Sequence, residues 1–269
     1  MDNQKNAAGM SMTKSNFGPW GWFTIFFAFM TLMLAGNLMV DSMNITVGAF
    51  AELRGWEMGV LLSWSTVAGL CALFGAGILS TLCAKIGVRK VYTVCIAIVA
   101  VCCMLWGSVT TIGQYAVIII LVNVFGDGMG FVASTAILAN WFPKKKGLAM
   151  GWATIGFQAS AILLLPVFQY LLNHYDLKAA YRFIGVLLFI MLFICIFVLK
   201  DNPEDRGVAP DNNTSFSIEE FQKMHQEALR LEKEYGLSTG QLLKTKQTWQ
   251  IGIINGLVQL AITCLIVQF

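Results

Sequence analysis

Residues 115–140 read YAVIIILVNVFGDGMGFVASTAILAN, an apolar stretch that is interrupted near its middle by Asp127. Its length, about 25 residues, is what a tilted helix needs to cross a bilayer. A carboxylate at bilayer depth costs roughly 2.5–3.5 kcal/mol on insertion scales, so we expect it to face a partner or a wet cavity. Gly126, Gly128 and Gly130 leave room for another helix or a solute beside the backbone. Asp127 is therefore either a structural residue in a packed bundle or part of a polar path through a membrane.

The composition of the whole chain is that of a membrane protein. Of its 269 residues, 57% are hydrophobic and 12% are charged, whereas about 25% are charged in a typical soluble domain. The formal net charge of +3 gives no reason to expect nucleic acid as a partner, and the partner that the composition implies is the lipid bilayer. The seven cysteines fall in apolar stretches, so we interpret them as small core residues and not as disulfides or metal ligands.

Hydropathy divides the chain into seven predicted transmembrane helices. We expect them at residues 20–50, 58–83, 91–110, 115–140, 148–172, 181–199 and 249–269. The first is too long for the core of a signal peptide and is predicted to be retained. The predicted domains are a polar N-terminal tail (1–19), a six-helix unit (20–199), a polar linker (200–248) and the seventh helix (249–269).

The positively charged residues predict the orientation. Of the 18 Lys and Arg residues, all but Arg54, Lys178 and Arg182 fall in the tail, in the loops after the second and fourth helices, or in the linker and its edges. Because Lys and Arg are enriched in cytoplasmic loops, we expect a multi-pass protein of the cell (plasma) membrane with a cytoplasmic N-terminus.

The polar linker contains a predicted amphipathic helix. Ser217 and Glu220 form a capping box. Apolar residues then recur every three or four positions: Ile218, Phe221, Met224, Ala228, Leu231 and Tyr235. We interpret this helix as a cytoplasmic connection between two halves, and partner binding or regulation is the alternative.

Two patterns recur in order along the chain. Asn37-x-x-x-Asp41 in the first predicted helix reappears as Asn123-x-x-x-Asp127 in the fourth, and GVLLSWST at 59–66 resembles GLAMGWAT at 147–154. A three-helix repeat must be inverted in the membrane, and inverted repeats are typical of secondary transporters, whose solute sites lie at the repeat interface. Chance matching of small residues is the alternative.

Polar residues within the predicted helices mark a candidate substrate and proton pathway. Amides can both donate to and accept from a carboxylate or hydroxyl solute, and a carboxyl group in the pathway could exchange a proton. An ordinary interhelical hydrogen bond is the alternative for each amide. The candidates are Asn37, Asp41 and Asn44 at helical spacing in the first helix, Asn123 and Asp127 in the fourth, Gln158 in the fifth, and Asn255 and Gln259 in the seventh.

Two loops resemble signatures of the major facilitator superfamily. Residues 82–90 (LCAKIGVRK) are similar to its loop between the second and third helices, with Ala84 where an Asp is usual. Residues 140–149 (NWFPKKKGLA) resemble the stretch after the fourth helix in the oxalate/formate antiporter and monocarboxylate porter branch, and residues 237–249 resemble the lead into its seventh helix. The resemblance implies that Lys85, Gly87, Arg89 and Lys90 form a cytoplasmic gating loop.

The resemblance implies a complete architecture. We expect an all-α membrane protein with a major facilitator-type six-helix bundle of two inverted three-helix repeats, plus a cytoplasmic linker and a seventh transmembrane helix. Because family members usually have twelve helices in two halves, the C-terminal half of the same protein is an expected partner that is missing here.

The function that the resemblance implies is secondary active transport of small organic anions by alternating access. The expected substrates are mono- or dicarboxylates such as formate, oxalate or lactate, with a proton or a counter-substrate as the coupling partner. Efflux of drug-like or other small solutes, and a non-transporting membrane sensor with the same fold, are the alternatives. An enzyme is not expected, and neither is a cofactor, because the sequence offers no nucleophile–base pair and no metal-spaced His/Cys cluster.

Overall fold

The computed structural model describes residues 17–212 and 244–268, and the regular elements within these ranges are helical. In chain order they are α1 (Gly18–Gly36), η1 (Asn37–Asp41), α2 (Ser42–Arg54), α3 (Met58–Ile86), α4 (Val88–Trp106), α5 (Ile112–Asp127), η2 (Gly128–Ala133), α6 (Ser134–Trp141), α7 (Lys146–His174), α8 (Leu177–Phe197), η3 (Pro203–Arg206), η4 (Pro210–Asn212) and α11 (Lys246–Gln268). The elements η1 and η2 are π-helical, and η3 and η4 are short 3₁₀-helices.

Six helices in the described ranges are long and apolar enough to cross a membrane. They are Gly18–Asp41, Met58–Ile86, Val88–Trp106, Ile112–Trp141, Lys146–His174 and Leu177–Phe197. Their order confirms the predicted all-helical membrane fold, with ends shifted by a few residues. The first helical stretch continues through α2 to Arg54.

The C-terminal part of the chain forms a separate unit and is described by itself. Its helix α11 covers most of the predicted seventh helix, but it is not among the six candidate spans. That residues 249–269 cross the membrane therefore stays a prediction. The amphipathic helix expected at 217–235 lies outside the described residues.

Local sequence explains where the helices begin and end. Gly55 takes a left-handed conformation with φ 66° and ends α2, and Gly87, with φ 98°, separates α3 from α4. The Thr111 hydroxyl accepts from the backbone N–H of Gln114 at 3.3 Å and caps α5. Asp176 caps α8 in the same way, accepting from the N–H of Ala179 at 2.6 Å. The short turns between spans are thus fixed by Gly and by capping side chains.

A π-helix interrupts both the first and the fourth span. In each case a serine follows directly and donates its hydroxyl to the carbonyl five residues back. Ser42 Oγ donates to Asn37 O at 2.8 Å, and Ser134 Oγ donates to Met129 O at 3.0 Å. π-Helical turns are rare overall, but those that occur are often found at functional sites. The two interruptions therefore mark these parts of the first and fourth spans as candidate parts of a site.

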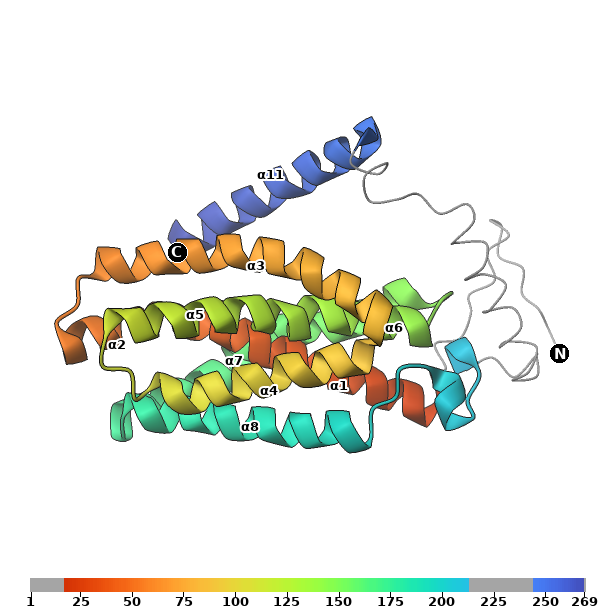
Figure 1. Cartoon of the computed structure of the whole chain (residues 1–269), viewed down its shortest axis with the longest axis horizontal. Helices are drawn as coiled ribbons and strands as arrows, with labels where there is room; N and C mark the ends of the chain where they lie inside the picture. The colour runs from red at the N-terminus through yellow and green to blue at the C-terminus, as the bar shows by residue number, and fades with distance from the viewer. Residues whose placement is uncertain (1–16, 213–243, 269) are drawn as a thin grey trace. The chain divides into compact units, whose positions relative to one another are not determined.

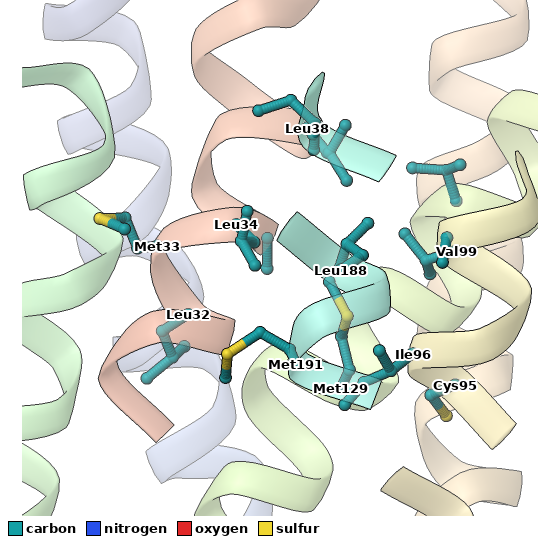
Figure 2. Close-up of a cluster of buried hydrophobic side chains, with 14 of the residues drawn as sticks. Leu32, Met33, Leu34, Leu38, Cys95, Ile96, Val99, Met129, Leu188 and Met191 are labelled. Atoms are coloured by element: carbon teal, nitrogen blue, oxygen red, sulfur yellow. The ribbon is translucent and has the colours of Figure 1, made fainter. Parts of the chain in front are cut away.

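The first span is the most deeply buried of the six. In Figure 1, α3 lies along α5, and α4 lies between α5 and α8, while α1 packs mainly against α7. Figure 2 shows the buried centre, where Leu34 and Leu38 of the first span meet Val99 of α4, Met129 of η2 and Leu188 of α8. Because lipid tails are as apolar as these side chains, close packing rather than the hydrophobic effect holds the spans together.

Glycine sets the closest approach between α1 and α7. A methyl group at Gly156 would overlap the backbone carbonyl of Phe29, whereas one at Gly151, on the same helix, would enter open space. We therefore expect Gly156→Ala to destabilise the folded protein by about 1–3 kcal/mol through overpacking. Thermal unfolding of the purified protein in detergent measures this. Gly151→Ala is the matched control, and an equal loss in both variants would contradict the proposed contact.

Candidate functional site

Two polar side chains, Asp41 and Ser160, meet between the first and fifth spans, and a third, Asn37, is buried on the same π-helix as Asp41. Asn37 and Asp41 belong to the π-helix η1, which packs against α7. Ser160 projects from α7, and its hydroxyl lies beside the Asp41 carboxyl. Gly36 allows this approach, because a Cβ there would lie 2.7 Å from the carbonyl oxygen of Phe157 and 3.3 Å from the Cβ of Ser160. We call Asn37, Asp41 and Ser160 the polar cluster.

The polar cluster lies in the interior, with Asp41 half-buried, and most of its hydrogen-bonding capacity is unused. Asn37 and Ser160 are 0% exposed. Among the described residues, four of the cluster's atoms have no hydrogen-bond partner: both amide atoms of Asn37, Oδ2 of Asp41 and Oγ of Ser160. A buried polar group without a partner costs about 1–3 kcal/mol, and native structures contain few of them. Amide, hydroxyl and carboxyl groups gathered in this way can both donate to and accept from a small polar ligand.

A second polar network, by contrast, is fully bonded. Tyr92 OH lies 2.6 Å from the hydroxyls of both Thr31 and Ser134, which are themselves 3.3 Å apart. In the other repeat, Tyr181 OH lies 2.8 Å from Thr46 Oγ1. The two tyrosines stand in the first turns of α4 and α8. These bonds tie the third and sixth spans to the first and fourth, and we interpret them as structural.

Asp127 stands apart from the polar cluster. It is the last residue of α5, directly before η2, and it is partly buried. Asn123, one turn earlier, donates its amide to the carbonyl of Ile119 at 2.9 Å. Within residues 17–212, no described hydrogen bond joins either residue to the polar cluster. Asp41 lies inside a π-helix whereas Asp127 precedes one, so the two Asn-x-x-x-Asp patterns do not occupy equivalent positions.

The remaining pathway candidates are not brought into the polar cluster. Gln158 is exposed and lies two residues from Gly156, on the side of α7 away from α1. Asn44 lies in α2, and Asn255 and Gln259 lie in α11, but the side chains of these three fall outside the description. Sequence reasoning did not select Ser160. Its spacing of four residues from Gly156, on one helical face, was the available signal.

The predicted gating loop lies at the junction of α3 and α4. Gly87 makes the turn, and Arg89 donates from its guanidinium to the carbonyl of Leu199 at 3.4 Å. Lys85 and Lys90 are exposed. The loop after α6, with Lys144 and its neighbours, lies at the same end of the bundle, because the segment that follows α8 contacts both loops.

This geometry defines a multi-pass α-helical membrane bundle with polar groups held between its spans. The sequence model of the Major Facilitator Superfamily matches residues 14–269, so the chain belongs to this family. This confirms the predicted family and fold class.

Curated relatives fall in the predicted branch. The chain is 28% identical over 171 residues to Monocarboxylate transporter 13 of Rattus norvegicus, a match that covers 63% of this chain and 40% of that protein. The Bos taurus protein of the same name matches equally. Oxalate:formate antiporter of Oxalobacter formigenes is 28% identical over 97 residues, or 35% of this chain and 23% of that protein. The chain thus spans less than half the length of these relatives.

The two kinds of buried serine should respond differently to the same substitution. Ser160→Ala removes a hydroxyl whose described contact is the half-buried Asp41 carboxyl, so we expect little change in stability. Ser134→Ala removes a hydroxyl that bonds Tyr92 and Met129, so we expect a loss of about 1 kcal/mol. Thermal unfolding in detergent compares them, and a larger loss in Ser160→Ala would show that its hydroxyl is structurally satisfied.

Proposed function

We propose that this chain takes part in secondary active transport of small organic anions, mono- or dicarboxylates such as formate, oxalate or lactate, by alternating access. The observation that carries the proposal is the polar cluster of the first and fifth spans, in which the buried Asn37 amide has no hydrogen-bond partner among the described residues. A carboxylate ligand needs hydrogen-bond donors. The Asn37 amide and the Ser160 hydroxyl supply two, and Asp41 supplies a third when it is protonated.

The polar cluster also gives a reason why the binding of an anion would be coupled to the binding of a proton. An ionised Asp41 would repel a carboxylate, whereas a protonated Asp41 would donate to it, so anion and proton would bind together. Exchange against a second carboxylate would use the same donors. In this proposal Asp41, in the polar cluster, and Asp127, in the fourth span outside the cluster, are the groups that can carry a proton.

The relatives support the substrate class. One is named for monocarboxylates and another for oxalate and formate, and both match only part of their own length. We place the protein in the plasma membrane with both basic loops in the cytoplasm, on the basis of the positive-inside rule.

Transport assays in proteoliposomes test the proposal. The protein expressed from its full-length gene should take up labelled formate, oxalate or lactate saturably, under a pH gradient or against preloaded carboxylate. Ser160→Ala and Asn37→Ala should each lower uptake by about tenfold, the effect of losing a hydrogen bond of about 1.4 kcal/mol to a charged ligand. Ser63→Ala, an exposed serine of α3 that donates to Gly59 O, is the matched control and should keep wild-type uptake.

The outcomes separate the functional classes. Absence of saturable flux for any carboxylate would overturn the proposal. Flux of drug-like solutes instead would favour an efflux carrier, and ligand-dependent partner binding without flux would favour a sensor.

Two Asp→Asn variants locate the proton site. We expect Asp41→Asn to abolish the pH dependence of uptake, because its amide cannot ionise. Asp127→Asn should slow proton-linked flux while membrane insertion is retained. Initial rates across a pH series measure both. Unchanged pH dependence in Asp127→Asn would make Asp127 structural, and unchanged pH dependence in both variants would exclude the two groups as the coupling site.

A further inference from the structure

Two basic loops and one acidic segment meet at one end of the bundle. The loop between α3 and α4 and the loop before α7 each carry three Lys or Arg residues and no acid over residues 83–91 and 140–149. Residues 199–212, which follow α8, carry the acids Asp201, Glu204, Asp205 and Asp211. We call residues 199–212 the strap. Charge complementarity between the strap and the loops is therefore built into the sequence.

Asp201 accepts a hydrogen bond from the first loop, between α3 and α4. Its Oδ1 accepts from the backbone N–H of Arg89 at 2.5 Å, in the first turn of α4. The residue that precedes this helix, Gly87, has no side chain to cap it, and a Cβ there would lie 3.2 Å from Oδ2 of Asp201. The carbonyl of Asp201 also accepts from the amide of Asn140 at 3.4 Å. A carboxylate at a helix N-terminus is stabilising, because it accepts an otherwise unpaired N–H and faces the positive end of the dipole.

Asp211 accepts hydrogen bonds from the second loop, between α6 and α7. Its two carboxylate oxygens accept from the backbone N–H groups of Lys144 and Lys145 at 3.0 and 2.8 Å, in the turn that leads into α7. Its own carbonyl accepts from Lys145 Nζ at 3.0 Å. The carboxylate is buried, at 7% exposure, and the backbone takes a left-handed conformation with φ 57° to present it. Few residues other than Gly, Asn and Asp adopt this conformation readily.

The strap also reaches the ends of the first and fourth spans. The Arg206 guanidinium lies 4.0 Å from the ring centroid of Trp20, in the first turn of α1. Trp141, the last residue of α6, donates from its indole to the carbonyl of Lys200 at 3.0 Å. Pro203 and Pro210 of the strap are buried. The strap therefore touches helices of both three-helix repeats.

We propose that the strap is a clasp in which Asp201 and Asp211 hold the two basic loops and so join the two repeats at this end of the bundle. Each carboxylate controls its own loop: Asp201 the α3–α4 loop, and Asp211 the α6–α7 loop. Under the proposed transport function, on which this last step rests, the clasp makes the cytoplasmic ends of the six helices move as one body. Asp201 and Asp211 are then positioning residues that affect turnover and not substrate binding.

Limited trypsin digestion of the full-length protein in detergent tests the clasp without any transport assay. The loops carry their own cleavage sites, at Lys85, Arg89 and Lys90 and at Lys144, Lys145 and Lys146. We expect Asp201→Ala to raise initial cleavage in the first loop by about tenfold, and Asp211→Ala to do so in the second, with first cuts mapped by mass spectrometry. A tenfold change corresponds to about 1.4 kcal/mol, which is typical for loss of a capping acceptor.

Matched variants sharpen the test. Asp205→Ala, at an exposed carboxylate of the same strap, should leave both loops at the wild-type rate. Asp201→Asn keeps the one oxygen that Arg89 needs and should behave like wild type. Asp211→Asn loses one of two acceptors and should be intermediate. Should an alanine variant fail to fold, Asp211→Asn decides the question: it should raise cleavage in the second loop to an intermediate rate and leave the first loop at the wild-type rate.

Three results would each overturn the clasp. The first is that trypsin cleavage becomes no faster at either loop, and the second is that either variant speeds cleavage of both loops equally, in proportion to a lower melting temperature. The third is that Asp205→Ala has the same effect as the other alanine variants. If carboxylate flux is found, the alanine variants should lower the maximal uptake rate with an unchanged KM. A changed KM would contradict the positioning role, whereas absence of flux in the wild type would defeat the proposed function and leave the digestion result standing.

Discussion

A polar group inside a bilayer has no water to bond, so its hydrogen bonds must be made within the protein. Most polar side chains of the six spans meet this requirement. Tyr92 is held by Thr31 and Ser134, Tyr181 is held by Thr46, and the hydroxyls of Ser42 and Ser134 donate to backbone carbonyls of the π-helices. In the polar cluster, Asn37 and Ser160 are as deeply buried as these networks, and the Asn37 amide lacks their bonds within the described residues. That contrast, more than polarity alone, marks it as the candidate site.

The fold and the site depend on the same glycines. Gly36 and Gly156 let the first span and α7 approach at backbone distance, and this approach is what brings Ser160 beside Asp41. Small residues are how membrane helices gain packing energy when no hydrophobic effect acts between them. The closest helix contact in this region is therefore also the place where polar side chains of two spans meet.

The architecture could be predicted from the sequence because long apolar runs separated by basic loops are compatible with few folds other than a bundle of membrane helices. The site could be predicted only in part, because residue spacing was interpreted with ideal α-helical geometry. That geometry does not run through η1, so the spacing that joined Asn44 to Asn37 and Asp41 no longer applies. Gln158 lies about 200° around α7 from Gly156, whereas Ser160 returns to the same face. The contacts that Asp201 and Asp211 of the strap make join positions far apart in the chain, and no local sequence pattern predicts such contacts.

Asp127 lies nearer the middle of its apolar run than Asp41 does, but the surroundings of the two residues favour Asp41 as the proton-carrying group. The glycines that flank Asp127 face apolar groups, since Gly126 lies against Met39, and Gly128 lies against Leu79 and Cys95. Asp41 instead lies beside the Ser160 hydroxyl, a donor that a carboxylate ligand could use. Coupling between two ligands is reciprocal and requires that each alters the other's binding free energy. A proton on Asp41 does so directly, by converting a repulsive carboxylate into a donor beside Ser160. A proton on Asp127 can do so only through a change in how the first and fourth spans pack, which is why Asp41 is the stronger candidate for the coupling step of the proposed transport cycle.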